Sequence, residues 1–135
     1  MALTGATRQS ERMTTLATIL IVEDYPVTQR VLSLTLRNSG HEVVVANHGG
    51  EALEQLDHSS VDLALVDIAM PQMDGLELLR HLRSDERYQQ LPVIMLTASG
   101  QDDDRQTALS IGADGFLSKP TSSRELIETI SKFIS

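Results

Sequence analysis

The chain has 135 residues, the usual size of one domain, and 41% of them are hydrophobic. Its formal net charge of −8 argues against nonspecific binding to nucleic acid or to an anionic membrane surface, because both favour a basic protein. The absence of cysteine excludes a disulfide framework and a thiolate metal site.

The beginning of the chain differs in character from the rest. Residues 1–15 are polar and aperiodic, so we predict a flexible tail or linker there and one domain over residues 16–135. The first apolar run, Leu16–Val22, is too short to cross a bilayer, and no signal peptide precedes it. We therefore expect a cytoplasmic protein with no membrane segment.

From Leu16 onward, short apolar runs alternate with helical patterns. The runs predict strands at Leu16–Val22, Glu42–Ala46, Val61–Val66, Pro92–Leu96 and Gly115–Ser118. Several of these runs are apolar without a break, which is typical of parallel strands covered on both faces. The alternation itself favours βαβ units.

Five helices are predicted after the strands. They cover about Val27–Asn38 with Gly40 as the C-terminal cap, about Gly50–Leu56, a segment starting at Asp74, about Asp102–Ile111 closed by Gly112, and a segment opening at Ser122. The last helix carries an apolar stripe that we interpret as core packing, namely Leu126, Ile127, Ile130, Phe133 and Ile134. Together these elements predict an α/β fold: a doubly wound (βα)5, flavodoxin-like parallel sheet of five strands. Its commonest strand order is 2-1-3-4-5.

Polar residues stand at the ends of four of the five predicted strands. Glu23 and Asp24 follow the first strand, Asp67 the third, Thr97 the fourth and Lys119 the fifth. In an open α/β sheet the ligand site lies outside the carboxyl ends of the strands, where the winding direction switches. With order 2-1-3-4-5 that point lies between strands one and three, so the five residues should meet in one pocket.

This set of residue types favours phosphoryl transfer at a divalent cation. Two carboxylates about 5 Å apart repel by roughly 3 kcal/mol at an effective dielectric near 20, so the cluster should raise a pKa or recruit a cation. Oxygen ligands without a thiolate favour Mg²⁺. Taken singly, each residue is more often a turn, cap or surface residue. Their joint placement favours a site in which Asp67 is the nucleophile, because carboxylates form aspartyl phosphates.

Four segments resemble the motifs of response-regulator receiver domains of two-component signalling systems. They are ILIVEDYPVTQRVL, LALVDIAMPQMDG, VIMLTAS and GADGFLSKP, in that order. The likeness covers about residues 17–134. It implies a signalling module that catalyses only its own phosphotransfer and autodephosphorylation, rather than an enzyme acting on a separate substrate.

The resemblance implies a Mg²⁺ site and a phosphoacceptor. Asp24 and Asp67 would contact Mg²⁺ directly, Glu23 would act mainly through a water molecule, and the backbone carbonyl of Ala69 would complete the protein ligands. Asp67 would accept the phosphoryl group. Glu23-Asp24 stands where Asp-Asp is also common in the family, so the water-mediated contact could be longer. Ala69 and Ser99 flank the path of the hydrolytic water, which leaves the lifetime of the phosphoryl group open.

The resemblance also implies a switch and partners. Thr97 and Lys119 would bind phosphoryl oxygens, and Phe116 matches the aromatic position that moves inward when Thr97 swings toward the phosphoryl group. The Lys119-Pro120 bond would be cis. The donor would be a sensor histidine kinase or a histidine phosphotransfer domain, which could dock on the face of Val27, Arg30 and Val31. A downstream protein or domain would receive the signal, without direct nucleic-acid binding by this domain.

Three alternatives can be tested against the sequence. A flavodoxin-like cofactor module needs a phosphate-binding loop after the first strand, where Glu23-Asp24 would repel a phosphate. A hydrolase acting through Asp67 needs a general acid–base nearby, and the four histidines lie away from the strand-end motifs. A degenerate receiver that only binds partners does not account for the intact set of Asp67, Thr97 and Lys119.

Overall fold

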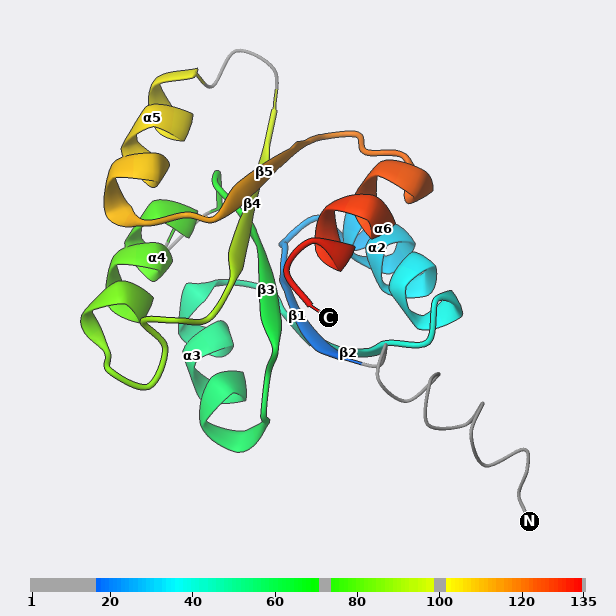
Figure 1. Ribbon diagram of the computed structural model, residues 1–135, viewed down its shortest axis with the longest axis horizontal. Helices are drawn as coiled ribbons and strands as arrows, with labels where there is room; N and C mark the ends of the chain where they lie inside the picture. Colours follow the sequence, from blue (N-terminus) through cyan, green and yellow to red (C-terminus); the bar gives the residue numbers. More distant parts are fainter. Residues whose placement is uncertain (1–16, 71–73, 99–101, 135) are drawn as a thin grey trace.

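The computed structural model describes residues 17–70, 74–98 and 102–134 (Figure 1). Its sheet contains β1 (Thr18–Val22), β2 (Glu42–Ala46), β3 (Leu63–Asp67), β4 (Val93–Thr97) and β5 (Gly115–Ser118). All neighbouring strands are parallel, and their order is β2-β1-β3-β4-β5. The predicted doubly wound sheet and its strand order are confirmed. The predicted tail at 1–15, the start of the first strand at Leu16, and Ser99 lie outside the described residues.

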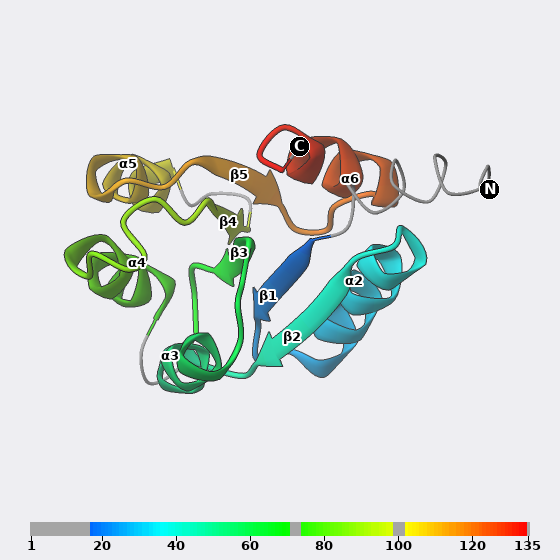
Figure 2. The same cartoon turned by 60° about the horizontal axis from the view of Figure 1, so that its bottom comes forward.

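Helices cover both faces of the sheet. They are α2 (Pro26–Asn38), α3 (Gly49–His58), α4 (Gly75–Ser84), α5 (Asp102–Ile111) and α6 (Ser123–Ser131). Figures 1 and 2 show α2 and α6 on one face and α3, α4 and α5 on the other. None of the helices in the described part of the chain is long and apolar enough to cross a membrane.

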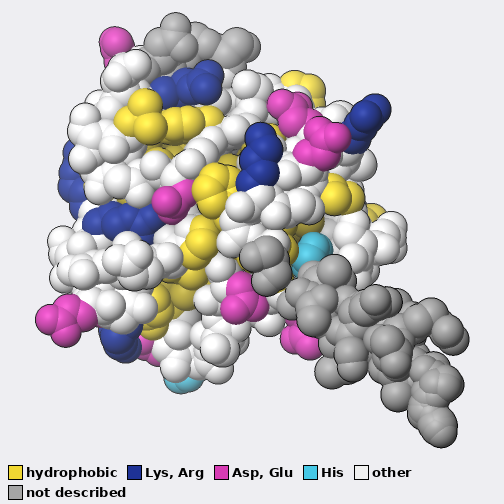
Figure 3. Space-filling view, in the orientation of Figure 1, with side chains coloured by type: hydrophobic (Ala, Val, Ile, Leu, Met, Phe, Trp, Pro, Cys, Tyr) yellow, Lys and Arg dark blue, Asp and Glu magenta, His cyan; other side chains and the backbone are white. Residues whose placement is uncertain are grey.

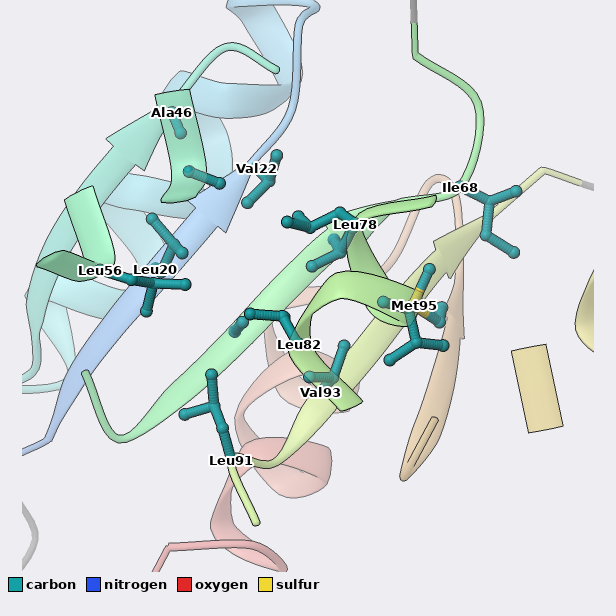
Figure 4. Packing of buried hydrophobic residues seen from close by; sticks show 14 of the residues in the cluster. Leu20, Val22, Ala46, Leu56, Ile68, Leu78, Leu82, Leu91, Val93 and Met95 are labelled. Carbon is teal, nitrogen blue, oxygen red and sulfur yellow. The ribbon is translucent and has the colours of Figure 1, made fainter. Parts of the chain in front are cut away.

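Each face of the sheet has its own hydrophobic core. One core packs β-strand side chains such as Leu20, Val22 and Met95 against α3 and α4 (Figure 4). The other contains the predicted stripe residues Leu126 and Ile130, with Phe133 packed against it. Phe133 and Ile134 come after the end of α6, so the stripe continues beyond the helix itself. The strands of the sheet centre are buried on both faces, which explains their unbroken apolar sequences.

Local sequence signals place the helix ends. Asp74 accepts a hydrogen bond from the backbone N–H of Glu77, and Ser122 accepts one from that of Glu125, as the spacing predicts. Gly40 and Gly112 have φ values of 96° and 125°, the left-handed conformation expected after a helix. α3 extends beyond the predicted range at both ends, and its start at Gly49 is capped by His48, whose Nδ1 accepts from the backbone N–H of Glu51.

Two strands end later than predicted, and this matters for the site. Asp67 is paired with Leu96 as the last residue of β3, and Thr97 is paired with Ser118 as the last residue of β4. Both polar residues are therefore held by the sheet ladder instead of lying in the loops that follow. β4 begins at Val93, after Pro92, since proline has no N–H to donate to a ladder.

Candidate functional site

The carboxyl edge of the sheet brings acidic residues of β1 and β3 together. Carboxylate oxygens of Glu23, Asp24 and Asp67 all lie within 4.8 Å of one another. Glu23 is fully buried and Asp67 is 3% exposed, whereas Asp24 is exposed. β1 and β3 are neighbours in the sheet, so the residues that follow them along the chain meet at its edge.

Lys119 lies between the two buried carboxylates. Its Nζ is 3.1 Å from Glu23 Oε1 and 3.2 Å from Asp67 Oδ2. The backbone N–H of Lys119 also donates to the carbonyl oxygen of Thr97, which ties the segment after β5 to the end of β4. The Lys119-Pro120 peptide bond is cis, as the resemblance implied.

The remaining oxygens of these carboxylates accept backbone hydrogen bonds. Asp67 Oδ1 accepts from the N–H of Ala69 at 3.3 Å, and Glu23 Oε2 accepts from the N–H of Tyr25 at 3.1 Å. Asp24 has no hydrogen bond or ion pair in the part of the chain that the structure describes. Its carboxylate is therefore exposed and available to a ligand.

The electrostatics of the cluster raise the pKa of Asp67 well above its ordinary value. Burial, and after it the charge of Glu23, raise the pKa of Asp67 to about 6 although Lys119 opposes the rise. Burial alone would lower the pKa of the Lys119 ammonium, but hydrogen bonds and charges from Glu23 and Asp67 raise it above its usual value. One ammonium thus faces two buried carboxylates with a third beside them, which leaves an excess of negative charge that a divalent cation would neutralise.

A glycine lets α4 approach the end of β3. A Cβ atom on Gly75 would collide with the backbone carbonyl oxygen of Asp67, and the N–H of Gly75 donates to the carbonyl of Ile68. The pair Asp74-Gly75 marks a helix start in the sequence, but the close contact with β3 depends on the packing of the two elements. No pattern in the sequence indicates this role of Gly75.

Thr97 and Phe116 lie on the neighbouring strands β4 and β5. Thr97 is buried at the end of β4, one residue beyond the ladder partner of Asp67. Phe116 is half-buried against the core beneath α5, and the Arg105 guanidinium lies 4.9 Å from the centre of its ring. The ring is therefore neither fully inside the core nor free in solvent.

The histidines supply no acid–base partner to this cluster. His41 precedes β2, and His58 and His81 stand at the far ends of α3 and α4. His48 does follow β2 at the carboxyl edge of the sheet, but its Nδ1 is occupied in capping α3.

Comparison with known proteins shows the family. The model of the response regulator receiver domain matches residues 19–131. The chain belongs to the response regulator receiver domain family. It is 43% identical over 112 residues to the transcriptional regulatory protein CpxR of Escherichia coli strain K12, a match that covers 83% of this chain and 47% of CpxR. The receiver domain therefore spans about half the length of that relative.

Solved structures agree with this assignment. The chemotaxis response regulator CheY4 of Vibrio cholerae matches with a TM-score of 0.84 and 31% identity, covering 89% of this chain and all of CheY4. The receiver domain of the sensor histidine kinase PA1611 from Pseudomonas aeruginosa PAO1 matches with a TM-score of 0.80 and 32% identity, covering 87% and 96% of the two chains. That structure has a magnesium ion coordinated in its active site cleft.

Proposed function

We propose that this receiver domain accepts a phosphoryl group on Asp67 from a phosphohistidine, in a Mg²⁺-dependent step, and that the modified domain presents a changed protein-binding surface. The observation that carries the proposal is the arrangement of Lys119 between two buried carboxylates, with the free Asp24 carboxylate beside them. These are the groups that hold a cation and neutralise a phosphoryl group.

The donor set fits Mg²⁺. Asp24 and Asp67 would bind the ion through their carboxylates, Glu23 through a water molecule, and Ala69 through its backbone carbonyl. All are hard oxygen ligands, and their number leaves positions for the water molecules that Mg²⁺ retains. When bound, the ion supplies positive charge against which the oxygens of the transferring phosphoryl group are stabilised.

Asp67 supplies the nucleophile and Lys119 supplies a fixed positive charge. An Asp67 carboxylate oxygen forms a bond to phosphorus as the phosphorus–nitrogen bond of the phosphohistidine breaks, and the departing nitrogen keeps the bonding pair. Lys119, already 3.2 Å from Asp67 Oδ2, stabilises the incoming phosphoryl oxygens. Thr97 donates its hydroxyl to one of these oxygens once they are present.

Phosphorylation of Asp67 would change the surface formed by α5, β5 and α6. The phosphoryl group adds up to about two negative charges and three acceptor oxygens. Movement of Thr97 toward it would change the space next to Phe116, which is now half-buried beneath Arg105. Burial of a phenylalanine ring is worth about 1.5–3 kcal/mol, enough to offset part of the rearrangement. The phosphoryl group therefore needs only to shift the equilibrium between two conformations of the domain.

The surface next to the site suits the phosphohistidine donor. A cavity of about 510 Å³ lies between α2 and the segment after β5, lined mainly by apolar side chains and also by Thr28, Lys119 and Thr121. Val27 and Val31 on its α2 side are 55% and 54% exposed. We propose that a sensor histidine kinase or histidine phosphotransfer domain packs there, in the cytoplasm, and that a separate protein or domain receives the signal.

Two measurements test the proposal. A histidine phosphotransfer protein phosphorylated beforehand should transfer its phosphoryl group to this chain in the presence of Mg²⁺. Val31→Glu should slow this transfer without slowing labelling by acetyl phosphate. Backbone amide shifts with and without beryllofluoride should change across residues 102–119 and 122–134. Shifts confined to the loops carrying Asp24 and Asp67 would contradict the switch.

A further inference from the structure

The Asp24 carboxylate depends on its backbone for orientation. Glu23 is held through its side chain by Lys119 and by the backbone N–H of Tyr25. Asp24 has no such contact in residues 17–70, 74–98 and 102–134. The peptide group between Glu23 and Asp24 therefore sets the direction in which the Asp24 side chain leaves the chain.

Gln29 of α2 holds that peptide group. Its Nε2 donates to the backbone carbonyl oxygen of Glu23 at 2.8 Å. The second hydrogen of the same nitrogen points to another loop, since Nε2 also donates to Asn47 Oδ1 at 3.0 Å. Both donors of the amide are used, one on the loop after β1 and one on the loop after β2.

Asn47 is in turn fixed to the first turn of α3. Its backbone N–H and its Nδ2 both donate to Glu51 Oε1, at 2.7 and 3.0 Å. Glu51 lies in the first turn of α3, whose start is fixed by the His48 cap. A continuous chain of hydrogen bonds thus runs from the helix through Asn47 and Gln29 to the peptide that carries Asp24.

We infer that Gln29, anchored by Asn47, is a positioning residue for the Mg²⁺ site: it acts on the ion through the Glu23-Asp24 peptide without touching the ion itself. The inference rests on the proposed function and adds a determinant of metal affinity outside the ligand set. If Gln29 only stabilised α2, its loss would change the stability of the fold and leave the metal affinity of the folded protein unchanged.

Methionine at position 29 separates these two roles. Gln29→Met keeps the length and the helix propensity of the side chain and removes both donors. Gln106→Met is the matched control, because Gln106 is exposed on α5 and its side chain makes no contact with the site. The Kd for Mg²⁺ would be measured by titration of the full chain, and urea unfolding in EDTA would report the metal-free stability of each variant.

We expect the Kd for Mg²⁺ to be about three- to tenfold higher in Gln29→Met, because the loss of one neutral hydrogen bond has an effect of this size. The Kd of Gln106→Met should equal the wild-type value. Asn47→Ala should also raise the Kd, and adding it to Gln29→Met should raise it little more, because both changes break one chain of hydrogen bonds. Asn47→Ala also serves as the test if Gln29→Met fails to fold.

Two results would contradict the account, and they are distinguishable. A wild-type Kd in Gln29→Met and in Asn47→Ala would overturn the positioning role and leave the proposed function standing. No Mg²⁺ binding by the wild-type chain would overturn the proposed function, and the positioning role with it.

Discussion

Replacing Asp67 by asparagine should stabilise the metal-free protein. Asp67 is 3% exposed and its pKa is raised to about 6 from an ordinary value near 3.8, by burial and then by Glu23. A rise of this size means that ionised Asp67 costs the folded state about 2–3 kcal/mol at neutral pH. Asparagine removes the charge and keeps the shape of the side chain.

Part of that gain is lost because asparagine weakens the contact with Lys119. The Lys119 Nζ now lies 3.2 Å from Asp67 Oδ2, and an amide is a poorer partner for an ammonium than a carboxylate is. We therefore expect Asp67→Asn to raise the free energy of unfolding by about 1–2 kcal/mol at pH 7.5 in EDTA. In a domain of this size that is a rise in melting temperature of roughly 3–8 °C.

The pH dependence identifies the cause. A carboxyl group whose pKa is raised in the folded state stabilises the fold fully below its unfolded pKa, and this contribution is lost as the pH rises through its folded pKa. The advantage of Asp67→Asn should therefore be small at pH 4 and below, grow as the pH rises from about 4 to about 6, and stay constant above that. Urea unfolding across this range, with exposed Asp57→Asn as a control, measures it. A variant no more stable than wild type at pH 7.5, or a difference independent of pH, would refute the reasoning.

Three further changes test the surrounding structure. Gly75→Ala should destabilise the fold by about 2 kcal/mol or more, as overpacking does at other buried sites, because the new Cβ collides with β3. Gly50→Ala in α3 should leave the free energy of unfolding almost unchanged, and urea unfolding measures both variants. Arg83→Ala should lower the free energy of unfolding by about 2–3 kcal/mol, because this largely buried guanidinium donates hydrogen bonds to the carbonyl oxygens of Gly112 and Tyr88 and to the Asp114 carboxylate. Arg87 is exposed, so Arg87→Ala should leave the melting temperature near that of the wild type. An equal effect of the two arginine changes would contradict this. Thr97→Ala should keep labelling of Asp67 and lose the amide shifts in α5 and α6; persistence of those shifts would separate Thr97 from the switch.

Patterns local in sequence were sufficient to predict the fold. The caps at Asp74 and Ser122 could be predicted because their partners lie three residues away. The alternation of strands and helices predicted a doubly wound sheet, and the strand order was predicted by analogy, as the commonest order for five such strands. On the face drawn in Figure 3, acidic and basic side chains are interspersed rather than gathered in patches of one sign, an arrangement that net charge alone does not reveal.

The individual atomic contacts between distant segments could not be predicted, although the sequence did predict that the strand-end residues meet at one edge of the sheet. The position of Lys119 between Glu23 and Asp67 joins residues 96 apart in the chain, and it depends on the register of four strands. The bonds from Gln29 to two loops depend on how α2 packs against the sheet. No local pattern marks either contact, so the sequence indicates candidate site residues but not the side chains that hold them in place.

Phosphorylation of Asp67 is the central claim, and intact mass spectrometry tests it most directly. The chain would be incubated with acetyl phosphate and Mg²⁺, with an EDTA sample and Asp67→Asn in parallel. We expect one added phosphoryl mass in the wild type, labile to base, and none in EDTA or in Asp67→Asn. An undiminished added mass in Asp67→Asn, or none in the wild type with Mg²⁺ bound, would contradict it.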